Sequence, residues 1–422
     1  MRILIWDMFE LRNTGGPSGY LYNIHEYLRN NPCKSIDFLS DIVETRPSQA
    51  TVDDNIDHHS ENTAKPHLHN RIWHSILKML DSVPKLKGTI TKYIDYTYRL
   101  YRIKWDKPVL VNEINSYDYI HFHFLIHVKQ FRNTYPDYKG KTIVTSHTPS
   151  PWTDELIQAD HSLRPIRPIM IRQECKLYNC ADYLMFPCIQ AKEPYEHNRL
   201  IKATLNKLER RTFYVPTSIV PYNPDCKDIP CRQDYNISNN AFVIAFFGRH
   251  NHVKGYDILM KIAIAAMELM PDIYFVCAGN GDIPPIEHPR WKELGFVSNV
   301  KDIMQICDLY VLPNRDTYFD LIVIECLRAG LHLAVSDTGG NKYFKTLPED
   351  ETAGISFFDI DISEDAVKLI EHVYKLKRDN PELFSQQKQC NKSLYENHFT
   401  TEKFIKKYMN SIKQLGKPIL NS

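Results

Sequence analysis

Two positively charged side chains stand where an apolar run gives way to a helical pattern. Residues 242–247 form an apolar run typical of a buried strand, and it is followed by GRHNHVKG at 248–255. Ligands of open α/β sheets bind at the carboxyl ends of the strands. Arginine offers phosphate oxygens a planar fork and lysine a point charge, so Arg249 and Lys254 predict a diphosphate site. The alternative is a surface turn with solvated charges. Burial of both cations against carboxylates of their own chain would remove the diphosphate interpretation.

A single carboxylate interrupts an apolar helical pattern further along the chain. Glu325 stands among isoleucine, valine and leucine side chains in the segment 321–329. Burying a carboxylate is costly unless it is paired. A ribose diol would supply the missing hydrogen bonds, and a bond to a neighbouring backbone or basic group is the alternative.

Short glycine-containing turns follow or precede the other apolar runs of this half. They are AGNGD at 278–282, GFV at 295–297 and DTGGN at 337–341. Each of them alone is an ordinary turn, because Gly, Asn and Asp favour turns for local backbone reasons. The GFV turn would present backbone groups to a nucleobase.

In their order along the chain these pieces resemble the donor domain of GT-B glycosyltransferases, and most closely the large retaining family 4 with its E-x7-E signature. The resemblance covers residues 242–345 well. It extends more loosely to the N-terminal half through Gly15-Gly16, His121-x-His123 and Thr145-Ser146-His147. It implies an α/β fold of two doubly wound Rossmann-like domains facing across a cleft. It also implies transfer of a sugar from a nucleotide-sugar, a UDP-sugar in our interpretation, with retention.

The resemblance assigns roles position by position. Arg249 and Lys254 match the cations that hold the donor diphosphate during catalysis, and His147 matches a histidine near the transferred sugar. Glu325 matches the second Glu of the signature, which binds the ribose, and Gly16 matches the glycine loop that faces donor and acceptor. The expected donor-binding residues are Gly16, Gly248, Phe296, Val297, Asp316, Thr317, Asp320, Leu321 and Glu325.

The chain departs from the family pattern at two positions. The first Glu of the signature falls at Thr317, with Asp316 one residue away, and the usual Gly falls at Asp320. A carboxylate at 320 would repel a diphosphate unless its side chain turns away. Because Arg249 and Lys254 are retained, we interpret these changes as those of a variant subgroup.

Histidines at predicted strand ends need a separate assessment. His121, His123 and His147 are compatible with a metal site, with packing in the core or cleft, or with an active-site role for His147. The resemblance implies no metal and no cofactor, since GT-B enzymes use protein cations instead. Gly15, Gly16 and Gly19 lack the spacing of a nicotinamide fingerprint.

Alternating strand and helix patterns position these residues. In the first half we expect strands at 3–6, 119–124, 142–146 and 183–186, a glycine turn at 14–20, and helices to about 28 and over 190–208. After a proline-rich break at 215–240, strands are expected at 242–247, 273–277, 309–312 and 331–335, and helices at 256–270, 300–307, 321–329, 363–378, 381–395 and 401–415. Such alternation is typical of parallel sheets covered on both faces.

Three parts follow from this pattern. We expect an acceptor-side domain at 1–215 with an insertion at about 34–107, and a donor-binding domain at 216–395. A C-terminal helix at 396–422 is expected to cross back to the first domain.

Composition limits the function classes. The 422 residues carry a net charge of +1, which gives no overall field for nucleic acid. Ten cysteines without a C-x-x-C pair suit a reducing compartment. We find neither a signal-peptide pattern at the N-terminus nor an apolar stretch of membrane-spanning length, and expect a cytoplasmic protein.

The segment 70–107 combines nine basic and three acidic residues with interleaved aromatics. It predicts a helical hairpin resting on anionic lipid, and thus a peripheral membrane contact. Amphipathic helices packed on the domain with a solvated basic face are the alternative.

The function that these observations favour is a glycosyltransferase acting on a saccharide or lipid-linked acceptor in polysaccharide or glycoconjugate biosynthesis. The alternative of another class is a catalytically silent GT-B subunit that binds a partner transferase or a carbohydrate, which the threonine at 317 favours. A sugar-nucleotide epimerase on the same fold is the third candidate.

Overall fold

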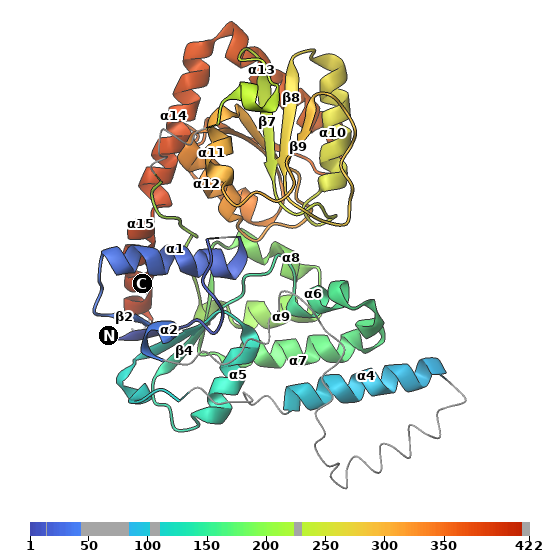
Figure 1. Ribbon diagram of the computed structural model, residues 1–422. Coiled ribbons are helices and arrows are strands. Elements are labelled where there is room, and N and C mark those ends of the chain that lie inside the picture. The colour runs from blue at the N-terminus through green and yellow to red at the C-terminus, as the bar shows by residue number, and fades with distance from the viewer. Residues whose placement is uncertain (14, 44–83, 102–109, 223–229, 416–422) are drawn as a thin grey trace. The chain divides into compact units, whose positions relative to one another are not determined.

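The computed structural model describes residues 1–13, 15–43, 84–101, 110–222 and 230–415, and they form two compact units (Figure 1). The first unit consists of Met1–Glu10, Cys33–Met185 and Asn198–Thr212, and the second of Leu11–Pro32, Phe186–His197 and Phe213–Ser422. The units therefore do not follow a single boundary near residue 215, because two segments of the N-terminal half cluster with the second unit.

The first sheet has the strand order β2-β1-β3-β4-β5-β6. Its strands are β1 (Ile3–Trp6), β2 (Ile36–Phe38), β3 (Tyr119–Phe122), β4 (Lys141–Thr145), β5 (Tyr183–Phe186) and β6 (Thr212–Tyr214). The pairings from β2 through β5 are parallel. The order reverses between β1 and β3, where a doubly wound sheet of this order binds its ligands.

Helices accompany this sheet in the first unit. They are α2 (Leu39–Ile42), α4 (Pro84–Tyr101), α5 (Leu125–Thr134), α6 (Trp152–Ala159), α7 (Arg167–Cys180) and α9 (Arg199–Lys207), with 3-10 turns at Ile114–Ser116, His161–Ile166 and Glu209–Arg211.

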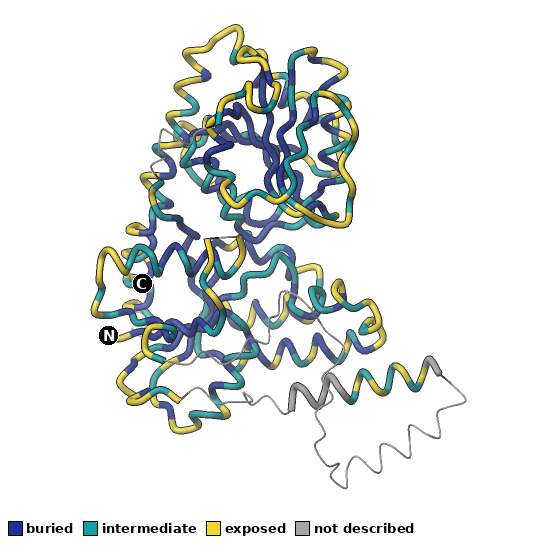
Figure 2. The backbone as a smooth tube through the Cα atoms, in the orientation of Figure 1, coloured by how far each residue is buried: buried dark blue, intermediate teal, exposed yellow. Residues whose placement is uncertain are grey.

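The second sheet has the order β12-β11-β10-β7-β8-β9, and its five pairings are all parallel. Its strands are β7 (Phe242–Phe247), β8 (Ile273–Ala278), β9 (Trp291–Glu293), β10 (Leu309–Leu312), β11 (His332–Ser336) and β12 (Ile355–Phe358). All six residues of β7 are buried, as Figure 2 shows for the centre of this sheet. Burial on both faces explains why the strand reads as one unbroken apolar run.

The second unit also contains helices. They are α1 (Gly16–Asn30), α8 (Glu193–Glu196), α10 (Tyr256–Leu269), α11 (Val300–Ile303), α12 (Leu321–Ala329), α13 (Ser363–Asp379), α14 (Pro381–His398) and α15 (Thr401–Gln414), with 3-10 turns at Gln190–Lys192, Arg232–Tyr235, Met304–Ile306 and Gly339–Thr346. Helix α10 packs against α13, and α12 against α14. Helix α15 packs against α1, with the rings of Tyr20 and Phe404 5.8 Å apart.

The sequence predictions of fold class and central strands are confirmed. The expected bounds of β1, β5, β7, β10 and α12 are those observed. The predicted helix over 190–208 is wrong as one element, because Asn198 begins α9 anew by accepting hydrogen bonds from two backbone N–H groups of its first turn. The predicted glycine turn at 14–20 is wrong beyond Gly15, since α1 already begins at Gly16. The predicted helix at 300–307 is a short α-helix followed by a 3-10 turn.

Part of the basic segment 70–107 is the helix α4, while residues 70–83 and 102–107 lie outside the described residues. Helix α4 packs against the 3-10 turn His161–Ile166, and Lys92 Nζ donates to Asp160 Oδ2 at 2.8 Å. This agrees with the alternative of a helix packed on its domain. The membrane contact stays a prediction.

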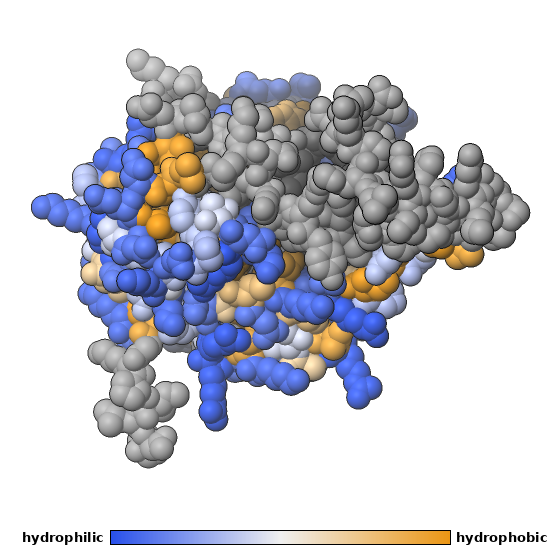
Figure 3. Space-filling model, turned by 90° about the horizontal axis from the view of Figure 1, so that it is seen from below, coloured by the Kyte–Doolittle hydropathy of each residue, from blue (hydrophilic) through white to orange (hydrophobic). Residues whose placement is uncertain are grey.

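On the face shown in Figure 3, hydrophilic side chains cover most of the described surface, and apolar side chains stand in small groups between them. None of the helices in the described ranges combines the length and the apolar character needed to cross a bilayer.

Candidate active site

The order of the second sheet reverses between β7 and β10. In open α/β sheets ligands bind outside the carboxyl ends of the strands at such a point. The loop 248–255 follows β7, and the loop 313–320 follows β10. We call the place where these two loops lie together the switch-point site. Its two loops carry six of the predicted site residues, which are Gly248, Arg249, Lys254, Asp316, Thr317 and Asp320.

Close packing fixes the loop that carries the two predicted cations. Gly255 has a φ of +64°, and a Cβ there would stand 1.7 Å from the Pro313 carbonyl oxygen, so only glycine fits. Arg315 holds the other side of the loop, because its guanidinium donates to both carboxylate oxygens of Asp257 at 2.8 and 2.7 Å and to the His252 carbonyl at 2.6 Å. The loop is therefore rigid where Lys254 leaves it.

The two cations differ in their surroundings. Arg249 is exposed, and its side chain has no ion pair with another residue in the described ranges. Lys254 is only 21% exposed, and its Nζ donates to Asp320 Oδ2 at 2.8 Å. The carboxylate of Asp320 thus faces the cation instead of turning away from it. One cation of the pair is free to meet a phosphate, and the other is held by a carboxylate of its own chain.

Asp320 is fixed by a second donor. The Nδ2 group of the fully buried Asn314 donates to the same carboxylate oxygen. The Asn314 carbonyl in turn accepts hydrogen bonds from Ser336 at 2.7 Å and Thr338 at 3.2 Å. Asp320 is the N-cap residue of α12, but its side chain caps none of the helix amides.

Glu325 lies inside α12 and retains acceptor capacity. No hydrogen bond or ion pair joins its carboxylate to another residue in the part of the chain that the structure describes. Burial raises the pKa of Glu325, while the charges of Arg328 and Lys301 act to lower that pKa. The Arg328 guanidinium is itself committed to the Val220 carbonyl, to which it donates at 2.7 Å. The Glu325 carboxylate therefore has acceptor capacity that a ligand hydroxyl could use.

The loop after β9 carries an exposed aromatic ring. Phe296 is 70% exposed, and Val297 beside it is half-buried. Glycine at 295 has a φ of +64°, its N–H donates to the Glu293 carboxylate at 3.3 Å, and its carbonyl accepts from Gly279 at 2.8 Å. The loop is anchored at its base, and the free ring of Phe296 can stack on a planar ligand.

The side chain of Thr317 is not accessible to a ligand. It is fully buried, its Oγ1 lies 3.1 Å from Thr338 Oγ1, and its carbonyl accepts from the Gly340 N–H at 2.8 Å. A Cβ at Gly339 would approach the Thr317 carbonyl oxygen to 2.1 Å. The residue at the place of the missing Glu is thus part of the packing between two loops.

A group of ionic side chains beside Thr317 was not predicted. Asp316 lies 3.5 Å from His197, and burial raises the pKa of its carboxyl. Lys342 pairs with Glu193 at 2.6 Å, and the Glu193 carboxylate also accepts from the Gly339 N–H at 3.3 Å. His197 and Glu193 escaped notice because their segment is more than a hundred residues away in the sequence.

Two further predicted donor residues lie at helix starts in the second unit. Gly16 is exposed with a φ of +73° at the first position of α1, where a left-handed backbone favours glycine. Leu321 is the half-buried first residue of α12. Gly248, directly after β7, is half-buried with only the Phe246 ring near a would-be Cβ.

The predicted histidines form a cluster in the first unit. His123 Nδ1 lies 2.8 Å from His147 Nε2, and His121 Nε2 lies 2.7 Å from Thr145 Oγ1. Burial lowers the pKa of both His121 and His147 to about 3 and that of the neighbouring His127 to about 4. His147 is therefore a neutral imidazole at pH 7. Within the described ranges, no three His, Cys, Asp or Glu side chains are grouped so that they could hold a metal ion.

This cluster predicts acid sensitivity of the fold. The unfolded chain takes up protons on these histidines below a pKa of about 6.5, whereas in the folded chain the pKa is about 4 for His127 and about 3 for His121 and His147. The stabilisation is therefore complete above pH 6.5 and is lost as the pH falls. We expect the free energy of unfolding to decrease by up to about 1.4 kcal/mol per pH unit for each buried histidine between pH 6 and 5.

Denaturant unfolding at pH 7.0, 6.0 and 5.0 measures this slope. A His127→Phe variant should show a shallower slope than the unchanged chain. Equal unfolding free energies at pH 6 and 5 would contradict the burial of neutral histidines.

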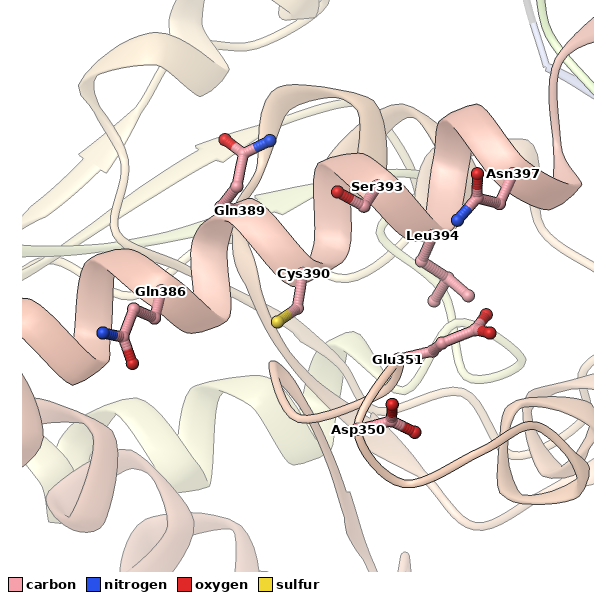
Figure 4. A pocket seen from close by; sticks show the side chains of 8 residues that line it. All are labelled: Asp350, Glu351, Gln386, Gln389, Cys390, Ser393, Leu394 and Asn397. Atoms are coloured by element: carbon pink, nitrogen blue, oxygen red, sulfur yellow. The ribbon is translucent and has the colours of Figure 1, made fainter.

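A groove of about 330 Å³ lies elsewhere on the second unit (Figure 4). Gln386, Cys390, Ser393 and Asn397 line it from α14, and Asp350 and Glu351 from the loop opposite. This loop precedes β12, so it belongs to the amino edge of the parallel sheet. The groove is therefore distinct from the switch-point site at the carboxyl edge.

Comparison with known proteins assigns a class to this architecture. Residues 241–377 match the family model described as glycosyl transferases group 1. The chain is 24% identical over 159 residues to the lipopolysaccharide core biosynthesis mannosyltransferase LpsB of Rhizobium meliloti, covering 33% of this chain and 45% of that protein. It is also 24% identical over 172 residues to the alpha-D-kanosaminyltransferase of Streptomyces kanamyceticus, covering 38% and 43%. The chain thus spans less than half the length of these curated relatives.

Solved structures match over nearly the whole chain. Sucrose-phosphate synthase from Thermosynechococcus elongatus superposes with a TM-score of 0.59 at 14% identity over 98% of this chain and 99% of that one. The Anabaena protein HepE in complex with UDP gives 0.59 at 12% identity over 98% and 100%. A glycosyltransferase from Rickettsia africae gives 0.57 at 14% identity over 100% and 99%. The chain has the GT-B fold of glycosyltransferases. Arg249, Lys254 and Glu325 all lie within residues 241–377, the segment that matches the glycosyl transferases group 1 model.

Proposed function

We propose that this protein is a glycosyltransferase that moves a sugar from a UDP-sugar to a saccharide or lipid-linked acceptor. The observation that carries the proposal is the place of Arg249 and Lys254, which stand at the switch point of a sheet within the matched family segment. The HepE complexes with UDP and with UDP-glucose support uridine as the base of the donor. Polysaccharide or glycoconjugate biosynthesis is the setting that suits such an acceptor.

The reaction breaks the bond between the anomeric carbon of the sugar and the terminal phosphate oxygen of the donor. The diphosphate leaves with the bonding electrons, and the acceptor hydroxyl oxygen forms the new bond and loses its proton. Arg249 and Lys254 offset the negative charge that develops on the leaving group, a form of electrostatic stabilisation that often supplies several kcal/mol. Protein cations take the place of a metal ion in this scheme, and the anomeric configuration is retained.

Other residues of the second unit orient the donor. Glu325 accepts hydrogen bonds from the ribose diol, which relieves a half-buried carboxylate that lacks a hydrogen-bond partner among the described residues. Phe296 and Val297 flank the base, and Gly16 allows the donor and acceptor to approach the start of α1. His147, in the first unit, is a neutral hydrogen-bonding group for the transferred sugar.

Donor hydrolysis tests the proposal without knowledge of the acceptor. The purified chain is incubated with a panel of UDP-sugars, and UDP and free sugar are quantified together. We expect slow release of both from one donor, and a thermal shift in the same samples. A ligand at 100 times its Kd adds about 2.7 kcal/mol of apparent stability. Absence of both hydrolysis and thermal shift with every UDP-sugar would overturn the proposal.

A catalytically silent subunit is the second candidate, and two observations favour it. Lys254 is already paired with Asp320, and Thr317 is buried in loop packing where the family has a carboxylate. The hydrolysis experiment separates the two candidates. UDP binding without turnover of any donor supports the silent subunit. An epimerase would instead release UDP together with an altered sugar and would need no acceptor.

A further inference from the structure

Lys254 and Asp320 form an ion pair within the switch-point site. The two side chains come from different loops, are 21% and 19% exposed, and meet at 2.8 Å. An aspartate at the N-cap ordinarily accepts hydrogen bonds from backbone amides of the first helical turn. The side chain of Asp320 makes no such capping bond with α12. Asn314 holds the carboxylate from the buried side. The pair is therefore fixed from both ends before any ligand arrives.

The same sheet edge holds another lysine–aspartate pair for comparison. Lys345 and Asp337 also meet at 2.8 Å, but they are 44% and 38% exposed. Asp337 follows β11, one strand away from the reversal between β7 and β10. Of these two pairs, the Lys254–Asp320 pair is the one that is less exposed and lies at the reversal of strand order.

A donor diphosphate and Asp320 need the same ammonium group. If Lys254 turns to the phosphate, Asp320 loses its counter-charge, yet it keeps the hydrogen bond from Asn314 and remains in place. The phosphate then meets a fixed carboxylate close by, and like charges in a partly buried site repel. Nucleotide binding must therefore offset both the broken ion pair and this repulsion.

We propose that Asp320 is an internal counter-ion that competes with nucleotide diphosphates for Lys254 and so sets the affinity of the site. This inference rests on the proposed function. Asp320 lowers the affinity of the site for both the nucleotide-sugar donor and the UDP product. It is a specificity-determining residue, because ligands that bring no diphosphate to Lys254 do not encounter the competition.

The test is a double-mutant cycle on UDP affinity, measured by isothermal titration at fixed ionic strength. The chains are wild type, Asp320→Asn, Lys254→Ala and the double variant. Asn removes the charge of Asp320 but keeps its shape. We expect Asp320→Asn to bind UDP about fivefold more tightly than wild type, the scale of one partly screened ion pair. In the Lys254→Ala background the same substitution should give a clearly smaller gain, because no ion pair has to be broken and only the repulsion between Asp320 and the phosphate remains.

The matched control is Asp337→Asn, which removes an equal charge at the same sheet edge and should leave UDP affinity unchanged. An Asp320→Asn chain that binds UDP no more tightly than wild type overturns the inference. So does an equal gain with and without Lys254, which would show a general charge effect. If Lys254→Ala weakens binding while Asp320→Asn changes nothing, the inference fails and the proposed function stands. If no chain binds UDP, the proposed function fails as well.

Discussion

Replacement of Lys254 by alanine is expected to lower kcat/KM for the sugar donor at least about 30-fold, or about 2 kcal/mol of transition-state stabilisation. The substitution removes a cation from the leaving diphosphate. It also leaves the Asp320 carboxylate, held by Asn314, beside that phosphate without a counter-charge. Both effects act in the same direction. Steady-state kinetics on the donor identified by hydrolysis measures the change.

A matched control separates the loss of leaving-group stabilisation from the loss of an ion pair as such. Lys345→Ala breaks a lysine–aspartate pair of the same 2.8 Å length at the same sheet edge, and we expect kcat/KM to stay close to that of wild type. If Lys254→Ala turns over like wild type, Lys254 does not stabilise the leaving group. An equal loss in both variants would instead indicate that the sheet edge as a whole had been disturbed.

The second large effect is expected from Glu325→Gln, which should weaken UDP binding about tenfold. Hydrogen bonds to charged groups contribute about 1.5–3 kcal/mol, and the amide replaces a charged acceptor by a neutral one. Titration with UDP and with its 2′-deoxy analogue locates the effect. Wild type should prefer UDP, and the variant should discriminate less between the two ligands.

Stability without ligand distinguishes a lost contact from a damaged fold. Burial raises the folded-state pKa of Glu325, so its contribution to stability is present below the unfolded pKa of about 4.5 and is lost as the pH rises. At neutral pH the ionised carboxylate therefore destabilises the unliganded chain. We expect Glu325→Gln to melt at or above the wild-type temperature while it binds UDP more weakly. A lower melting temperature together with unchanged UDP affinity would contradict the ribose role.

The central strands could be predicted because they are buried on both faces. Strand β7 reads as an unbroken apolar run, and its predicted bounds are those observed. Strands β2, β6, β9 and β12 are the edge strands of the two sheets, and each has only three or four residues. They take their conformation from pairing with a longer neighbour, which leaves little periodicity in their own residues.

Those parts of the site whose residues are close together in the sequence could be predicted. Arg249 and Lys254 share one loop, and Glu325 interrupts one apolar helix. The contact between Lys254 and Asp320 joins residues 66 positions apart, and it depends on how two loops pack around Gly255. Local patterns carry no information on such a contact, so from the sequence we could state only that Asp320 would repel a diphosphate unless its side chain turned away.

A crystal structure of the protein with saturating UDP would show whether the switch-point site holds a diphosphate. We predict that the diphosphate lies against Arg249 and Lys254 at the carboxyl ends of β7 and β10, with the ribose on Glu325 and the Lys254–Asp320 pair opened. A structure in which UDP binds elsewhere, while Lys254 still contacts Asp320, would contradict this prediction.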